Sequence, residues 1–146
     1  MTYCANSDVQ IACGGRQRLI ELTDQESSGE VNQAVLDQAR AAAEAWINSK
    51  IGPRFAVQLA APVPSIVVAY SAQETKFQLM VMRGMVTPDE EKAREIREKF
   101  FTDVKDGNAS LGIEPPPGKS SSVKATWVAR ASDEDISRES LKGALT

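Results

Sequence analysis

The side chains best spaced to bind a metal ion lie in the polar segment from Asp24 to Asn32. Aligned with the calcium loop of an EF-hand, this segment has its glycine where that loop turns sharply. The oxygen ligands and this glycine would be supplied, in chain order, by Asp24, Glu26, Ser28, Gly29, Glu30 and Asn32. The last position needs a bidentate carboxylate, but Val35 occupies it. We therefore interpret the segment as a solvated acidic loop and predict no metal site there.

Acid–base chemistry is a second possibility, because it needs paired carboxyl groups whose pKa values differ. Neighbouring carboxyl groups occur at Glu90 and Glu91 and at Asp133 and Asp135, and both pairs lie in polar sequence typical of an exposed surface. The chain has no histidine, which excludes Ser-His-Asp and Cys-His catalytic groups and histidine metal ligands. It also has no Walker-type phosphate loop and no GxGxxG motif. The sequence therefore predicts a non-enzymatic protein without a cofactor.

The composition is that of an ordinary globular protein of 146 residues, with 42% hydrophobic and 25% charged residues. A net charge of −3, with the two signs interspersed along the chain, gives no general attraction to nucleic acid. No apolar run approaches the ~20 residues needed to cross a bilayer, and the first ten residues do not resemble a signal peptide. We expect a cytoplasmic protein in which Cys4 and Cys13 are reduced, buried residues.

Capping residues and apolar spacing predict a mainly helical chain. Two short helices are expected at 8–13 and 16–22, followed by three long ones at 33–50, 64–83 and 88–106. Ser7, Asn32 and Thr87 are the expected N-caps, and the segment 55–64 is short enough for one brief extended piece. The third long helix also has possible surface ion pairs between Glu90 and Arg94 and between Glu95 and Lys99.

The long helices should bury the faces on which apolar residues recur at three- and four-residue intervals. These positions are Val35, Leu36, Ala39, Ala42, Ala43, Trp46 and Ile47 in the first, Ile66, Ala69, Tyr70, Gln73, Phe77, Met80 and Val81 in the second, and Ala93, Ile96, Phe100 and Val104 in the third.

The character of the sequence changes after residue 112. A linker rich in proline and serine, at 113–122, separates a helical domain at 1–112 from a C-terminal arm at 123–146. The arm begins with a period-two pattern that predicts a strand at 123–130, and a short helix is expected at 133–142. A single strand needs a partner, which another chain could supply. The strand face expected at that interface consists of Val123, Ala125, Trp127 and Ala129.

Three segments together resemble a known family: LIELTDQESSGEVNQAVLDQA, a proline-bounded start of a long helix, and KDGNASLG. The chain is similar, between Ser7 and Gly112, to the head–tail adaptor (neck or connector) proteins of Mu-like phages and prophages. Its loop has SSG where an acidic, Asp-Gly-rich version is commoner in that family, which further disfavours calcium binding. The segment after Pro115 has no counterpart in the resemblance.

The resemblance implies a small helical bundle whose copies form a dodecameric, homo-oligomeric ring beneath the portal. It also implies a C-terminal arm that reaches a neighbouring subunit or the portal. The expected partners are the portal protein and a tail-side neck or stopper protein, while genomic DNA passes through the ring without sequence-specific recognition. The expected location is the host cytoplasm during assembly and the virion neck afterwards, with no membrane association.

Two other hypotheses remain open from the sequence. A small cytoplasmic helical protein-binding module, or regulator, would also have a bundle with an exposed interaction surface. A calcium-responsive or hydrolytic protein is disfavoured by Val35 and by the absence of histidine. The leading hypothesis is a structural adaptor of a phage neck.

Overall fold

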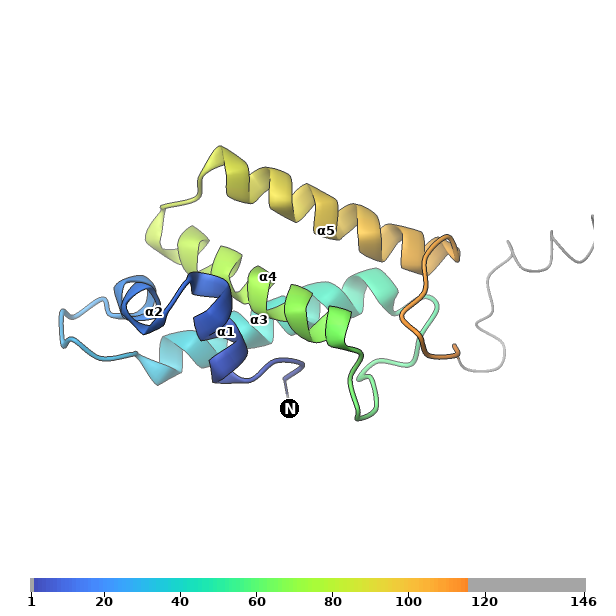
Figure 1. The fold of residues 1–146 in the computed structure, drawn as a ribbon, viewed down its shortest axis with the longest axis horizontal. Helices are drawn as coiled ribbons and strands as arrows, with labels where there is room; N and C mark the ends of the chain where they lie inside the picture. The colour runs from blue at the N-terminus through green and yellow to red at the C-terminus, as the bar shows by residue number, and fades with distance from the viewer. Residues whose placement is uncertain (1, 116–146) are drawn as a thin grey trace, which may run out of the picture.

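The computed structural model describes residues 2–115 and is mainly helical, as predicted (Figure 1). Within this part of the chain there are five α-helices and no strand. The helices are α1 (Asn6–Cys13), α2 (Arg16–Thr23), α3 (Gln33–Ile51), α4 (Ser65–Arg83) and α5 (Pro88–Asp106). Most of the predicted linker, the predicted strand and the predicted C-terminal helix lie outside the described residues.

The three long helices form an antiparallel bundle with α4 at its centre (Figure 1). On one side α4 packs against α3, and on another it contacts α5, which also lies against α3. The short helices α1 and α2 pack together, with α1 beside the middle of α4 and α2 near the end where α4 finishes. As a result, α4 contacts every other helix. Among residues 2–115, no helix is long and apolar enough to span a bilayer.

The ends of the long helices follow the capping rules. The Asn32 side chain accepts a hydrogen bond of 3.2 Å from the backbone N–H of Val35 at the start of α3. The Thr87 hydroxyl accepts one of 3.3 Å from Glu90 N–H, with Pro88 in the first turn of α5. Gly84 ends α4 in the left-handed conformation that glycine adopts without strain. The predicted boundaries of these helices are therefore confirmed to within a residue or two.

The start of α1 differs from its prediction. The N-cap is Ala5 rather than Ser7, and Ser7 lies inside the first turn. The Asp8 carboxylate accepts a hydrogen bond of 2.7 Å from the backbone N–H of Ala5. An acceptor that reaches back from the third helical position therefore takes the place of a capping hydroxyl.

The core consists of two apolar clusters. One joins α1 and α2 to the first half of α3 and the second half of α4. The other joins the second half of α3 and the start of α4 to α5 and the segment after it. Residues 55–64 contain bends and no strand, and they contribute Phe55 and Leu59 to the second cluster as buried side chains.

The predicted buried faces are right for part of α3 and wrong in parts of α4 and α5. In α4, Ala69, Gln73 and Val81 are exposed, whereas Glu74 and Thr75 are completely buried. Because four helices surround α4, it is buried around most of its circumference, and a single stripe does not describe it.

The buried face of α5 is turned relative to the prediction. Ile96 is 65% exposed, whereas its neighbour Arg97 is only 1% exposed. Arg97, Phe101 and Val104 form the buried line, and Phe100 lies half-buried beside it. The predicted surface ion pairs of α5 are replaced mainly by pairs that connect it to α3 and α4.

Candidate protein-binding groove

The acidic loop from Asp24 to Asn32 is held in place by hydrogen bonds within the loop. The Asp24 carboxylate accepts hydrogen bonds from Ser28 N–H at 2.9 Å, from the Ser28 hydroxyl at 3.0 Å and from Gly29 N–H at 2.7 Å. These donors hold the pKa of Asp24 below its usual range. Asn32 is occupied as the cap of α3, while Glu26 and Glu30 remain exposed. Within residues 2–115, no three acidic or cysteine side chains gather where they could hold a metal ion.

Asp24→Ala is expected to lower the stability of the protein at neutral pH, because the turn at Ser28 and Gly29 loses its acceptor. The contribution of a carboxyl group with a lowered folded-state pKa is fully present above its ordinary pKa of about 3.9. It is lost as the pH falls through the lowered folded-state pKa. Urea unfolding of both proteins should therefore show a difference at pH 7 that closes in strong acid. Glu26→Ala is the control, and a gap that stays constant across this range would contradict the assignment.

The two cysteines are free and buried, as predicted. Cys4 lies near the hydroxyl groups of Ser71 and Thr75, at 3.5 and 3.9 Å. Burial raises the pKa of Cys13, against the opposing effect of the nearby Lys76 and Arg18 charges. Neither thiol therefore has the environment of a reactive nucleophile.

A buried group of charged side chains joins α4 to α5, and the sequence patterns did not reveal it. Glu74 is completely buried, and its two oxygens lie 3.1 Å from Arg97 Nη2 and 3.1 Å from Arg94 Nε. Gln78 donates a further hydrogen bond of 3.0 Å to the same carboxylate. Arg94 is also placed against an aromatic ring, with its guanidinium carbon 4.6 Å from the centroid of Phe77. This group holds the two helices in register rather than presenting a charge to solvent.

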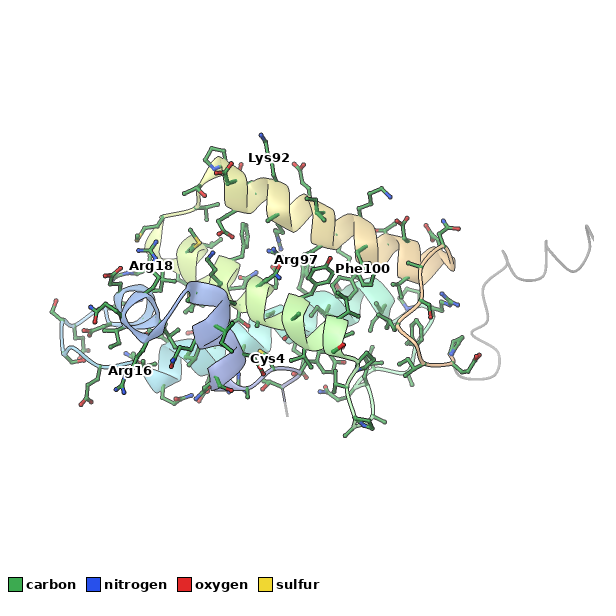
Figure 2. The ribbon with its side chains drawn as sticks, viewed as in Figure 1. Cys4, Arg16, Arg18, Lys92, Arg97 and Phe100 are labelled. Carbon is green, nitrogen blue, oxygen red and sulfur yellow. The ribbon has the colours of Figure 1, made fainter. Side chains whose placement is uncertain are left out.

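Figure 2 shows that Arg97 projects from α5 toward α4, whereas Lys92 points away from the bundle. One turn earlier, a second ion pair crosses between the same helices, from Lys76 Nζ to a Glu90 oxygen at 2.5 Å. Glu90 therefore serves as an interhelical anchor, and Glu91 is exposed. Of the two carboxyl pairs noted in the sequence, Glu90 and Glu91 therefore lie in different surroundings, and Asp133 and Asp135 lie outside the described residues.

These ion pairs lie beside a groove of about 710 Å³ where α1 and α5 lie on either side of the exposed face of α4. Its surface is mainly apolar, with charged side chains at its edges. The apolar lining residues are Ile11, Ala12, Val63, Val68, Ala69, Ala72 and Ala93. Ile11 is 78% exposed. Sites that bind other molecules are typically concave and apolar, with a few polar groups, so this groove is the strongest candidate for an interaction site among residues 2–115.

The predicted interface face, Val123, Ala125, Trp127 and Ala129, lies outside the described residues, so it stays a prediction. Trp46, predicted to lie on the buried face of the first long helix, is half-buried in the second cluster and packs edge-to-face with Phe101 at 5.9 Å between ring centroids. The sequence could have pointed to the groove through the small residue Ala69, which is exposed on α4, but its position between α1 and α5 depends on the packing.

A family model described as bacteriophage Mu, Gp36 matches residues 3–128. The chain belongs to the bacteriophage Mu Gp36 family. Comparison with curated proteins gives no match. The assignment confirms the resemblance to Mu-like phage proteins, but the family match extends beyond the predicted range of Ser7 to Gly112. The Gp36 match covers all five helices and continues through the first part of the arm, including Trp127.

Membership of the Gp36 family identifies this chain as a phage protein and supports a role in phage structure or morphogenesis. The described residues agree with such a role. The Glu74 carboxylate is buried in the packing of α4 and α5, Asp24 accepts the hydrogen bonds of a loop turn, and the groove is mainly apolar.

Proposed function

We propose that this protein is a non-catalytic head–tail adaptor of a tailed phage, which forms a ring between the portal and the tail-side neck proteins. The observation that carries the proposal is the match to the Gp36 family over residues 3–128. The groove between α1 and α5 supports it, because a small bundle with an uncovered apolar groove is suited to protein contacts. Exposed Ile11 and Ile96 add apolar surface on the two helices that border the groove.

Ring formation follows from the kind of contact that such a subunit can make. When a groove on one copy receives a different surface of the next copy, the contact is heterologous and closes into a ring if the rotation fits. The arm at 123–146 supplies such a second surface, with Val123 and Trp127 on its apolar face. In this proposal the subunit assembles in the host cytoplasm and resides in the virion neck, where DNA passes without base-specific contact.

Deletion of the gene is expected to leave filled or empty heads that lack tails, and the full chain supplied in trans should restore joined particles. A chain ending at Gly112 keeps all five helices but lacks the arm, so it should fold and fail to join the portal. Circular dichroism checks the fold, and mass spectrometry of purified virions checks incorporation. Normal incorporation of the shortened chain would refute a role for the arm.

Absence of the full-length protein from purified virions would contradict the adaptor proposal itself. Together with normal head–tail joining in the deletion strain, that result would favour the alternative of a helical protein-binding module or regulator. The genes beside this one provide an independent check, because an adaptor gene is expected near portal, capsid and tail genes.

A further inference from the structure

The groove on α4 presents an apolar surface that residues 2–115 do not cover. We propose that residues 123–130 of the same chain occupy this groove in the free subunit, with Val123, Ala125, Trp127 and Ala129 facing α4. The arm would then shield the interaction surface of its own subunit until a partner displaces it. This inference concerns the isolated chain and does not depend on the adaptor function.

The side chains of the groove and those of the arm are complementary in size. Four of the apolar lining residues are alanines, contributed by three different helices: Ala12, Ala69, Ala72 and Ala93. Small side chains on all walls leave room for a large incoming one, and Trp127 is the largest residue of the arm. A buried tryptophan in a desolvated pocket is a frequent anchor of protein contacts.

The lengths also agree. The groove follows α4 from Ser65 to Lys76, a stretch of about 16 Å at the helical rise of ~1.5 Å per residue. An extended segment from Val123 to Ala129, the first and last residues proposed to face α4, covers about 20 Å at ~3.3 Å per residue. The period-two part of the arm is therefore long enough to fill the groove, and little of it would extend beyond.

The chain leaves the bundle close to the correct end of the groove. Leu111 belongs to the same apolar cluster as Val63, and Val63 lines the groove where α4 begins. From Pro115 to Val123 there are eight residue steps, which can span up to about 27 Å when extended. This reach makes occupation by the same chain feasible without any movement of the helices.

Charge complementarity gives the direction of the arm. An arm that enters near Val63 would run parallel to α4 and place the following acidic run, Asp133 to Asp135, beyond the far end of the groove. The basic side chains of Lys76 and Arg18 are both close enough to Cys13 at that end to influence its pKa. In this orientation the acidic run would approach Lys76 and Arg18, which also pair with Glu90 and Glu21, so opposite charges would lie close together.

Residues 2–115 contain no strand and so offer the arm no sheet edge; the groove is a helical surface. The arm would be held by its apolar side chains, while its backbone groups remain accessible to water on the open side of the groove. Binding of this kind is weaker than strand addition, which suits a cover that must be displaced.

The test places a photoreactive group at the predicted anchor of the full-length chain, as Trp127→p-benzoylphenylalanine. Irradiation of the dilute protein should give cross-links within one chain, and mass spectrometry should locate them at Ile11, Val68 or Ala69. The same group at Ser120 is the probe control and should not label the groove. Cross-links only between two chains, cross-links elsewhere, or no cross-link at all would each overturn the proposal.

A matched pair of alanine substitutions tests the groove itself. Ala69→Glu introduces a charge into the groove and should reduce the cross-link yield about tenfold, the effect of ~1.4 kcal/mol. Ala41→Glu introduces the same charge on the exposed face of α3 and should leave the yield unchanged. Circular dichroism verifies that both variants fold. An equal yield in both variants would exclude the groove as the binding surface.

Discussion

Glu74→Gln is expected to lower the free energy of unfolding by about 3–5 kcal/mol, the usual cost of removing one partner from a buried ion pair. Glutamine has nearly the same size as glutamate, so the change removes a charge and leaves the packing intact. Arg97, 1% exposed, would then keep its positive charge inside the bundle without a carboxylate. Its Nε already has no hydrogen-bond partner among residues 2–115, so the remaining contacts cannot compensate.

The same reasoning predicts that removing both charges costs far less than removing one. In the double variant Glu74→Leu, Arg97→Met, apolar side chains of similar length replace the pair, which is often neutral or stabilising. Arg94 keeps its contacts with the rings of Trp46 and Phe77. Urea unfolding of the two single variants and the double variant gives the coupling energy directly.

An exposed ion pair between α3 and α5 is the control. Glu98 pairs with Lys50 at 2.5 Å, but half of its side chain is exposed. Lys50 holds the pKa of Glu98 below its usual range, yet water screens the pair, so Glu98→Gln should cost less than about 1 kcal/mol. A loss for Glu74→Gln no larger than that of the control would show that the pair does not stabilise the bundle.

The sequence predicted where the long helices begin and end because the deciding interactions are local. Asn32 and Thr87 cap backbone groups three residues away, and Gly84 ends a helix by its own conformational freedom. Such signals need no knowledge of the rest of the fold. The exception, at Ala5, arose because the acceptor comes from Asp8, inside the helix, rather than from the capping residue.

The buried faces were harder to predict because they depend on how many neighbours a helix has. The predicted buried faces of α4 and α5 did not include Glu74 or Arg97, yet these two residues pair inside the bundle across a separation of 23 residues. One signal was present in the sequence: Glu74 lies in the middle of a largely apolar helix, where an acidic residue usually has a buried partner. The partner itself could not be named without the packing.

The candidate groove could not be predicted from local sequence patterns either. Its lining comes from α1, α4, α5 and the segment before α4, and no local pattern links residues from four separate segments. The exposed positions Ala69 and Gln73 were predicted to be buried, because alternating small and polar residues resemble an inner stripe. The arm was predicted from a local pattern, its period-two alternation; it lies outside the described residues and stays a prediction, and the family match extends through residue 128.

Phe101→Ala is expected to cost about 3–5 kcal/mol, because it removes a completely buried aromatic side chain from the second core cluster. The Phe101 ring makes edge-to-face contacts with Trp46, Tyr70 and Phe100 at centroid distances of 5.9, 5.8 and 5.4 Å. All three contacts are lost together, and α3, α4 and α5 all border the resulting cavity. The cavity therefore cannot close by the shift of one side chain.

Ile96→Ala is the control that makes this prediction specific to the observed orientation of α5. Ile96 was expected in the core from its spacing, but it is 65% exposed, so its truncation should change stability by less than about 0.5 kcal/mol. Urea unfolding followed by circular dichroism measures both variants without relying on Trp46, which contacts Phe101. A large loss for Ile96→Ala with a small one for Phe101→Ala would mean that α5 is rotated toward the orientation predicted from the sequence. A large loss of stability for Phe101→Ala and a small one for Ile96→Ala are expected from the observed orientation, because the buried face of α5 consists of Arg97, Phe101 and Val104.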